Sequence, residues 1–475
     1  MMQRGDSDLL LAGAAMVDIT PAAGTHLAGS AMGERRPART VLDPLFAKAV
    51  ILTQGDRRIC LVTLDVTIVD EPYTTQIRQG IADRAGVPVE AVMVHGIQTH
   101  SAPGLGRFML DPDFPLETTP ETEYLWGSES AYAERVTQAA IQAAVDAASR
   151  LRPARIGVGR GILGGVAFNR RGIRRDGTIM MPKPAGRENQ PLGLTDLCYL
   201  EGPIDPEVGV ACIQGLDMRP LALLLHYACH PVHIFGQAET YHAVSADWPG
   251  AWAREMQRAL GDDVVPLVVN GCCGNTNPWH PFDPDCRPNH LRMGRELAAM
   301  AQRVVHTLRY VERATLDWRL DHVALPYREI PEERLRQVAD LMAQHPEPPR
   351  GPTGEVDPRW FAAASTRSVE LCRAREPAFA YEIQTLRIGD LALVGLPGEP
   401  FVEGQLAIKV GSAAPYTFVA HLTTRYVGYL PTAQAYTRGG HEANGEVTYW
   451  AKLAPGCLET VVERTRALVH ELFAG

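Results

Sequence analysis

The sequence lacks several features that would assign the protein to a specialised class. It contains no run approaching the roughly 18 consecutive apolar residues that a membrane-spanning helix needs. It has no cluster of Lys and Arg, and acidic residues outnumber basic ones by 55 to 46, giving a net charge of −9. Internal repeats and low-complexity tracts are also missing. We therefore expect neither a membrane nor a nucleic acid as a partner.

Cysteine is sparse and lacks the regular spacing of a disulfide framework. There are nine cysteines, an odd number, and two of them, Cys272 and Cys273, are adjacent. Reduced thiols are the simplest interpretation. The N-terminus is polar, and the short apolar run at residues 9–12 leads into a strand pattern rather than the core of a secretory signal. We therefore predict a cytoplasmic protein.

Apolar residues make up 45% of the chain, which is enough for a large buried core. Strand-length apolar runs alternate with helical periodicity, which predicts an α/β fold with a layered mixed β-sheet core and surrounding helices. The predicted strands are residues 49–52, 59–66, 89–94, 154–158, 221–227, 264–269, 379–388 and 391–396. The predicted helices are residues 74–85, 132–150, 249–260, 291–311, 331–344 and 458–473. We interpret residues 1–475 as a single domain with an inserted helical and loop region at about 327–378.

Two histidine clusters follow predicted strands. His95 and His100 lie just past residues 89–94, and His230 and His233 lie just past residues 221–227. Open α/β sheets build sites from distant segments in this way, at the ends of their strands. Imidazole is a common zinc ligand and exchanges protons near neutral pH. The clusters therefore predict an enzyme with a metal-assisted or acid–base site.

Further polar side chains occupy turns of the same kind. Glu399 follows residues 391–396 and is placed either to point into a site or to begin a helix. Asp247 precedes a predicted helix, as a site carboxylate or an N-cap. Asn277 ends a turn of small residues and amides that could cradle an anion or oxyanion. One long loop carries basic residues that either recognise a carboxylate or form a solvated charged surface; they are Arg170, Arg171, Arg174, Arg175 and Lys183.

Eight short motifs, taken in order, resemble the N-terminal catalytic domain of the neutral/alkaline ceramidase family. They are Ala12-Gly13-Ala14-Ala15-Met16-Val17-Asp18-Ile19-Thr20-Pro21, Asp43-Pro44-Leu45-Phe46-Ala47-Lys48-Ala49, Thr99-His100-Ser101-Ala102-Pro103-Gly104, Asn169-Arg170-Arg171, Ala228-Cys229-His230-Pro231, Ser245-Ala246-Asp247, Gly274-Asn275-Thr276-Asn277-Pro278 and Pro397-Gly398-Glu399-Pro400-Phe401. The resemblance implies one catalytic domain of that family, without its C-terminal immunoglobulin-like domain.

The resemblance also implies a zinc site. In that family two histidines, a glutamate and a tyrosine bind Zn²⁺, and position by position three of these ligands correspond to His230, Glu399 and Tyr429. The family histidine that assists at the scissile amide corresponds to His100. Zinc would polarise the amide carbonyl and lower the pKa of its bound water to about 7.

The sequence departs from the family at three of these positions. Gln98 stands where the family has its other zinc-binding histidine, Asn277 where it has a serine, and His441 where it has an active-site tyrosine. Glutamine offers only a neutral oxygen, a poorer match to zinc than imidazole. Either the metal site is weakened, His95 or His233 substitutes, or no metal binds.

These residues lead to a set of assignments. The predicted catalytic residues are His100, His441, Tyr429 and Asn277; the predicted substrate-binding residues are Gln98, Asn169, Arg170 and Arg171; and the predicted metal ligands are His230, Glu399 and Tyr429.

The leading hypothesis for function is a ceramidase-superfamily, metal-dependent hydrolase that cleaves an amide or related bond in a soluble substrate. The alternative is a lyase or glycoside-cleaving enzyme that uses His and Tyr as acid and base on a uronate-containing carbohydrate. A third interpretation is a non-catalytic binding protein. The expected partner is a small molecule or an oligosaccharide, and the oligomeric state stays open, with a homo-oligomer one option.

Overall fold

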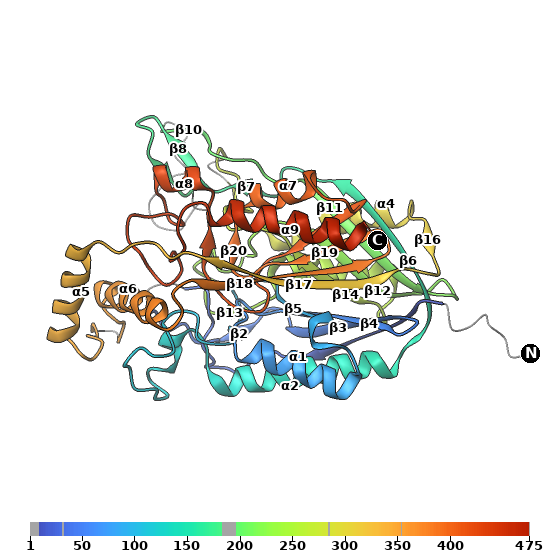
Figure 1. Cartoon of the computed structure of the whole chain (residues 1–475), viewed down its shortest axis with the longest axis horizontal. Helices are drawn as coiled ribbons and strands as arrows, with labels where there is room; N and C mark the ends of the chain where they lie inside the picture. The colour runs from blue at the N-terminus through green and yellow to red at the C-terminus, as the bar shows by residue number, and fades with distance from the viewer. Residues whose placement is uncertain (1–8, 31–32, 183–195, 284–285, 353, 475) are drawn as a thin grey trace, which may run out of the picture.

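The computed structural model describes residues 9–30, 33–182, 196–283, 286–352 and 354–474. Two β-sheets form its centre, and helices lie along their outer sides (Figure 1). In the described part of the chain the larger sheet has nine strands in the order β14-β12-β11-β6-β1-β3-β4-β5, with β16 paired to β6. The smaller sheet has four, in the order β17-β18-β19-β21.

The long strands have the following bounds. The larger sheet contains β1 (Leu11–Asp18), β3 (Phe46–Gln54), β4 (Arg57–Leu64), β5 (Val92–Gly96), β6 (Arg152–Ile162), β11 (Glu207–Gly215), β12 (Pro220–Tyr227), β14 (Val265–Asn270) and β16 (Tyr310–Val311). The smaller sheet contains β17 (Leu316–Leu325), β18 (Phe379–Ile388), β19 (Leu391–Gly395) and β21 (Tyr416–Ala420).

Short strands tie loops together outside these two sheets. The pairs are β2 (Thr40–Val41) with β13 (Ala243–Val244), β7 (Phe168–Asn169) with β15 (Thr276–Asn277), and β20 (Glu399–Pro400) with β22 (Tyr429–Leu430). A small three-stranded sheet contains β8 (Gly172–Arg174), β9 (Ile179–Met180) and β10 (Leu197–Leu200).

Helices cover the sheets in groups. α1 (Tyr73–Ala85) and α2 (Ser130–Ser149) pack together beside β1 and β3, and α3 (Asp247–Leu260) and α4 (His290–Val305) pack beside β14 and β6. α7 (Val402–Val410) and α9 (Cys457–Phe473) lie on the smaller sheet (Figure 1). The remaining helices are α5 (Glu332–Gln344), α6 (Pro358–Arg375) and α8 (Ala433–Arg438), with the 3-10 turns η1 (Val89–Ala91) and η2 (Glu123–Trp126). No helix in the described ranges is long and apolar enough to cross a membrane.

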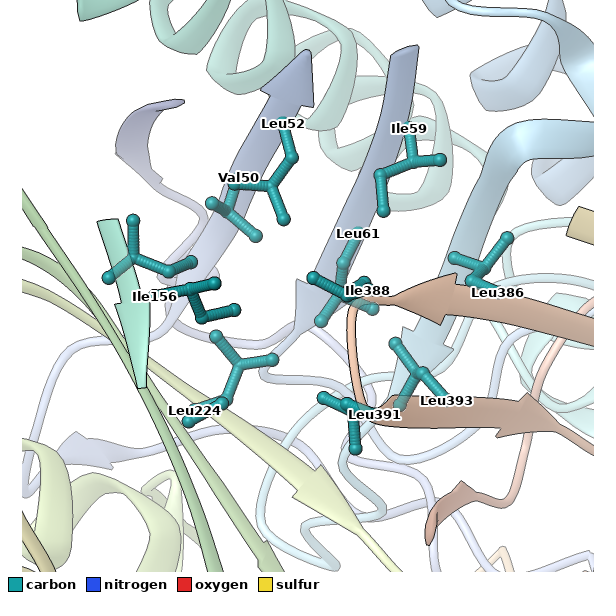
Figure 2. Close-up of a pocket in the computed structure, with 12 residues that line it drawn as sticks. Val50, Leu52, Ile59, Leu61, Ile156, Leu224, Leu386, Ile388, Leu391 and Leu393 are labelled. Carbon is teal, nitrogen blue, oxygen red and sulfur yellow. The ribbon is translucent and has the colours of Figure 1, made fainter. Parts of the chain in front are cut away.

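The core lies between the two sheets. β3 is buried along almost its whole length because it has α2 on one face and side chains of β18 and β19 on the other. Figure 2 shows side chains of both sheets, among them Val50, Leu61 and Leu393, around an apolar gap of about 10 Å³. That gap holds about one water molecule and has no polar lining, so it is a packing space rather than a binding site.

Small residues allow helix α2 to approach strand β1 closely. α2 is rich in alanine, and its small buried side chains let it lie against β1. A Cβ atom at Gly13 of β1 would come within 2.0 Å of the carbonyl oxygen of Ala147, so only glycine fits there.

The carboxyl ends of parallel strands meet where the predicted site lies. The pairs β4–β5, β12–β14 and β19–β21 are parallel. The loops that follow them are joined by backbone hydrogen bonds: His230 donates to Thr276 at 3.0 Å, Gly274 to Pro400 at 3.1 Å, and His421 to Asn270 at 3.2 Å. Strand ends far apart in the sequence are thereby brought to one edge, as expected for α/β sheets.

The predicted fold class is confirmed, since the model has a layered mixed sheet with surrounding helices. Two predicted elements were wrong in part. The strand expected at residues 89–94 begins only at Val92, because the residues after Pro88 form the turn η1. The helix expected at residues 291–311 ends at Val305, and residues 310–311 instead form β16 beside β6. The helices α5 and α6 occupy the region predicted as an insertion.

Candidate functional site

His230 and Glu399 form the centre of the candidate site. Both are buried, and Nε2 of His230 lies 3.2 Å from Oε2 of Glu399. Nδ1 of the same ring lies 3.2 Å from the carbonyl oxygen of Thr276, while the hydroxyl of Tyr426 donates to Oε1 of Glu399 at 2.8 Å. Burial alone would raise the pKa of Glu399, but the contact with His230, the charge of Arg170 and the Tyr426 hydroxyl lower it to about 2. Glu399 is therefore a carboxylate.

Burial and the nearby Arg170 lower the pKa of His230. A neutral imidazole carries one N–H, yet the His230 ring faces two acceptors, the Thr276 carbonyl and the Glu399 carboxylate. One of these contacts therefore sets two lone pairs against each other unless a cation, either a proton or a metal ion, lies between them.

Tyr429 and Arg170 extend the centre on one side. β20 and β22 pair in parallel with Glu399 opposite Tyr429, so both side chains lie on the same face of this ladder. The guanidinium of Arg170 lies 5.4 Å from the centre of the Tyr429 ring, and its Nε donates to Glu442 at 2.7 Å. Burial and the charge of Glu399 raise the pKa of Tyr429, while Arg170 opposes them. The His441 ring lies 5.6 Å from the Tyr429 ring.

His100 lies against His230 on another side, with 5.5 Å between the ring centres. Its Nδ1 is 3.2 Å from the carbonyl oxygen of Gly29, so Nδ1 carries the proton and Nε2 has a lone pair. That Nε2 is buried and has no hydrogen-bond partner among the described residues. Burial lowers the pKa of His100 to about 3, and His230 adds to the effect. Gly29, at φ 92°, leaves room for the ring, because a Cβ atom there would come within 2.8 Å of Nδ1.

Gln98 lies in a second polar group with His421 and Cys273. Its Oε1 is 3.0 Å from Nε2 of His421 and 3.3 Å from the Cys273 thiol. Gln98 has a φ of 67°, which is uncommon for a residue with a side chain. Burial lowers the pKa of His421 to about 4. The charge of Glu399 opposes this shift, and His230 adds to it. The position that lacks the family histidine is thus next to an imidazole from another strand.

The two suggested substitutes for that histidine are engaged elsewhere. Nδ1 of His95 is 2.6 Å from the His421 carbonyl oxygen, and its Nε2 accepts from the backbone N–H of Asn270 at 3.0 Å. His95 therefore has no nitrogen left for a metal. His233 pairs with Asp247, with 2.9 Å between Nδ1 and Oδ1.

The predicted catalytic residue Asn277 and the remaining predicted substrate-binding residues differ in their surroundings. Asn277 is buried in β15 and lies 3.5 Å from Nη1 of Arg170. Asn169 binds the backbone, accepting from Arg171 at 3.0 Å and donating to Pro203 at 3.1 Å. The buried Arg171 donates to Glu442 at 2.8 Å and also pairs with Glu201. Arg170 and Asn277 thus join the centre, while Asn169 and Arg171 support the loop behind it.

The outer part of the basic loop lies away from this group. Arg174 pairs with Asp196 at 3.3 Å, and the backbone N–H of Arg175 donates to the Asp196 carbonyl at 3.1 Å. Lys183 falls outside the described residues.

The sequence did not predict three residues of the site: Tyr426, which contacts Glu399, His421, which contacts Gln98, and Glu442, which contacts Arg170. The first two follow β21, an apolar run that was not recognised as a strand. Glu442 follows His441 directly, and its two oxygens hold Arg170 and Arg171. If β21 had been recognised as a strand, His421 and Tyr426 would have been placed just after a strand end, in the way that the strand at residues 221–227 placed His230.

The donor set fits a divalent cation only if Tyr429 takes part. Among the described residues no three His, Cys, Asp or Glu side chains form a group that could hold a metal. His230 and Glu399 offer an imidazole nitrogen and a carboxylate oxygen, which are common zinc ligands, and Tyr429 adds a phenol oxygen. The contact of Nδ1 of His230 with a backbone carbonyl is the arrangement that metal-bound histidines usually adopt. The facing lone pairs of His230 and Glu399 provide a place for a positive ion.

Comparison with known proteins identifies the fold. No protein-family model matches the sequence. Among solved structures, the neutral ceramidase from Pseudomonas aeruginosa has a TM-score of 0.71 and 18% sequence identity, over 99% of this chain and 75% of that chain. A ceramidase complexed with C2 has a TM-score of 0.70 and 18% identity, over 98% and 75%. The chain thus has an α/β fold of the ceramidase type, and the predicted resemblance in fold is confirmed.

Proposed function

We propose that the chain is a hydrolase that uses a divalent cation, with zinc the best match, to cleave an amide or related bond in a soluble substrate. The observation that carries this proposal is the buried contact of 3.2 Å between Nε2 of His230 and Oε2 of Glu399. A neutral imidazole and an ionised carboxylate at this distance are a natural pair of metal ligands. The ceramidase-type fold supports the same reaction class.

Each residue has a defined part in such a reaction. His230, Glu399 and Tyr429 would hold the ion, which when bound supplies a Lewis acid for the carbonyl and an activated water. The unpartnered Nε2 of His100, on a ring that stays neutral, would accept a hydrogen bond from the attacking water or the substrate amide N–H and orient it. Arg170 places a positive charge beside the same group and stabilises negative charge that develops on the carbonyl oxygen.

Metal analysis of the purified full-length chain tests the proposal. We expect close to one zinc or other divalent ion per chain, hydrolysis of some members of a panel of N-acyl compounds, loss of activity in chelator and recovery on adding zinc. Glu399→Gln should lose both the metal and the activity. The exposed Glu90→Gln is the matched control and should keep both. A chain without stoichiometric metal whose activity is unchanged in chelator would contradict the proposal.

A second candidate is acid–base elimination from a uronate-containing carbohydrate, or cleavage of its glycosidic bond. It is favoured by the ring distance of 5.6 Å between Tyr429 and His441, beside Arg170. A phenol and an imidazole can exchange protons, while arginine neutralises a carboxylate. Incubation with uronate oligosaccharides tests this candidate, because either reaction shortens the oligosaccharide, and elimination also yields an unsaturated product that absorbs ultraviolet light.

A further inference from the structure

Two adjoining cavities lie beside the N-terminal end of α1, with volumes of about 330 and 250 Å³. Glu71, Arg107 and Pro112 line both of them. The wall of the larger cavity includes the rings of Tyr73 and Trp126, whereas the smaller one is lined mainly by charged side chains. Together the two cavities reach the volume range of small-molecule sites, roughly 300–1,000 Å³.

Tyr426 joins the smaller cavity to the candidate site. It lines the cavity, its backbone N–H donates to Asp70 at 2.9 Å, and its hydroxyl donates to Glu399 at 2.8 Å. The central residues His230, Glu399 and Tyr429 line neither cavity. The two cavities are therefore a separate space that touches the candidate site through one side chain.

Two of the three arginines in the smaller cavity are already paired. Arg375 donates to both oxygens of Asp111, at 2.7 Å each, and also pairs with Asp113. Arg425 donates to both oxygens of Glu376, at 3.2 and 2.7 Å. These bidentate ion pairs occupy the guanidinium groups, so Arg375 and Arg425 stabilise the wall of the cavity.

Two of the lining carboxylates also have partners. Glu71 lies 3.8 Å from Arg425. Glu123, in the larger cavity, accepts the backbone N–H of Ser130 at 2.8 Å and also the hydroxyl of that residue. Ser130 begins α2, and the N-terminal turn of a helix favours a negative charge. Arg107 and Asp70 are the lining charges that remain to be accounted for.

Arg107 has no carboxylate partner among the described residues. Its guanidinium lies over the ring of Trp126, 4.2 Å from the ring centre. Its two terminal nitrogens make only long contacts, of 3.4 Å each, to the Pro112 carbonyl oxygen and the Thr118 hydroxyl. A guanidinium held in this way can still bind a carboxylate through two parallel hydrogen bonds.

Asp70 is the complementary group. Its side chain is buried, and within the described part of the chain no cation lies at ion-pair distance from it. Burial raises the pKa of Asp70 to about 7, although the N–H of Tyr426 and the charges of Lys452 and Arg425 oppose this shift. A buried carboxylate without a cation beside it is costly, so an ammonium group in the cavity would be favoured there.

Asp70 and Arg107 lie on neighbouring segments. The residues just before them, Val69 and Leu105, form a parallel β-bridge. Gly106, with a φ of 104°, lets the two segments approach, because a Cβ atom there would come within 2.6 Å of the Cβ of Asp70. A carboxyl group and a guanidinium that do not pair with each other therefore line the same small cavity.

We propose that the two cavities bind a free amino acid with an aromatic or apolar side chain. Its ammonium group pairs with Asp70, its carboxylate pairs with Arg107, and its side chain contacts Trp126 in the larger cavity. An occupant with a single charge would leave the other protein group uncompensated. This binding does not depend on any reaction at His230 and Glu399.

Calorimetric titration of the full-length chain tests the proposal in slightly alkaline buffer, in which Asp70 is ionised. L-phenylalanine is compared with two analogues that each lack one charge. Hydrocinnamate has the ring and the carboxylate but no ammonium group, and phenethylamine has the ring and the ammonium group but no carboxylate. We expect L-phenylalanine to bind at least about tenfold more tightly than either analogue.

Substitutions should divide the three compounds in a defined way. Arg107→Met should weaken L-phenylalanine and hydrocinnamate by about tenfold or more and leave phenethylamine unchanged. Asp70→Asn keeps an acceptor for the N–H of Tyr426 and should weaken L-phenylalanine and phenethylamine to a similar extent, with hydrocinnamate unchanged. Arg336→Met and Asp340→Asn, both at exposed positions of α5, are the matched controls and should bind all three compounds as the wild type does.

Three results would overturn the proposal: no saturable binding of L-phenylalanine, equal wild-type affinity for the three compounds, or wild-type affinity for L-phenylalanine in both variants. The comparison of the three compounds on the wild-type chain remains decisive if a variant fails to fold. Amino acids also bind zinc, so Glu399→Gln should keep the affinity for L-phenylalanine, and loss of binding in that variant would place the ligand on the ion instead. Binding as expected by a chain with neither metal nor activity would support these cavities and contradict the proposed hydrolysis alone.

Discussion

At the scale of single residues, the candidate site is a buried group of charges that compensate one another. The Arg170 guanidinium, which is almost fully buried, has the Glu442 carboxylate at 2.7 Å. Glu399 likewise has His230 and the Tyr426 hydroxyl. An uncompensated buried charge costs several kcal/mol, so each partner keeps the other in its functional form. The same compensation makes stability depend on pH.

Glu442→Gln should change how stability depends on acid. Burial alone would raise the pKa of Glu442, but Arg170, with His441 and Arg171, lowers it from 4.5 to about 2. A folded-state pKa below the unfolded one adds stability that is present above about pH 4.5 and is lost as the pH falls toward 2. For the wild type we expect this loss to be on the order of a few kcal/mol, measured by urea unfolding at a series of pH values.

In Glu442→Gln the free energy of unfolding should be lower at neutral pH, because Arg170 and Arg171 lose a carboxylate, but it should fall less between pH 4.5 and 2. The exposed Glu90→Gln is the control and should follow the wild-type curve. Parallel curves for wild type and Glu442→Gln would show that this carboxylate does not titrate as described.

Gln98→His should increase the affinity for zinc. The present Gln98 amide lies 3.0 Å from His421, and imidazole is a stronger zinc ligand than an amide oxygen. We expect the dissociation constant, measured by competition with a chromogenic chelator, to fall by about tenfold or more, since one additional ligand contributes more than 1.4 kcal/mol. Gln98→Asn keeps the amide and should show no gain. If the zinc dissociation constant of Gln98→His equals that of the wild type, this position does not face the ion.

At the scale of elements, the site depends on how the segment after β21 is held. This segment carries Tyr426 and Tyr429, and its Leu422 and Thr424 have positive φ values of 48° and 59°. Thr424 donates to Glu382 at 2.7 Å, and Arg78 of α1 donates to both oxygens of Glu382, at 3.0 and 2.8 Å. A helix and a strand of the smaller sheet therefore fix the backbone from which the tyrosines extend.

Arg78→Met should destabilise the protein by about 3–5 kcal/mol, because it leaves Glu382 buried without its cation. Chemical denaturation measures the effect, and activity should fall together with it as the Thr424 segment loosens. The double variant Arg78→Met, Glu382→Leu removes both charges and should recover most of the lost stability. A single variant as stable as the wild type would show that this ion pair does not hold the segment.

At the scale of the whole molecule, two stacked sheets form a rigid base for the loops. Side chains from both sheets fill the space in Figure 2, which leaves only about 10 Å³ free. Interiors packed this densely respond to the loss of a few methylene groups. The site lies at the strand ends rather than in this core, so the stability of the fold and the chemistry of the site can be changed separately.

Leu393→Ala should lower the free energy of unfolding by about 2–5 kcal/mol, since Leu393 is fully buried between the sheets and its removal enlarges the gap. Thermal and chemical unfolding measure this loss. Zinc content and kcat/KM of the folded fraction should stay at wild-type values. Val410→Ala, at a side chain that is 85% exposed, should change stability by less than about 0.5 kcal/mol. A Leu393→Ala protein as stable as the wild type would contradict a close-packed interface between the sheets.

Local features of the chain could be predicted from the order of its residues. The hairpin around Gly55, the helix α9 and the strand β18 follow from apolar periodicity and turn residues, which act over a few neighbouring positions. The same patterns predicted the α/β class, and they placed His230 and Glu399 just after strands. Ordered motifs also predicted the resemblance in fold to ceramidases.

Which of these side chains meet, and in what protonation state, depends on contacts that form only when the chain is folded. Arg170 and Glu442 are 272 positions apart in the chain, and Gln98 and His421 are 323 apart, so no local pattern links them. Contacts at this range depend on the order in which strands join the sheets. Burial and hydrogen-bond partners, which exist only after folding, make Glu399 a carboxylate and give His100 a lone pair on Nε2.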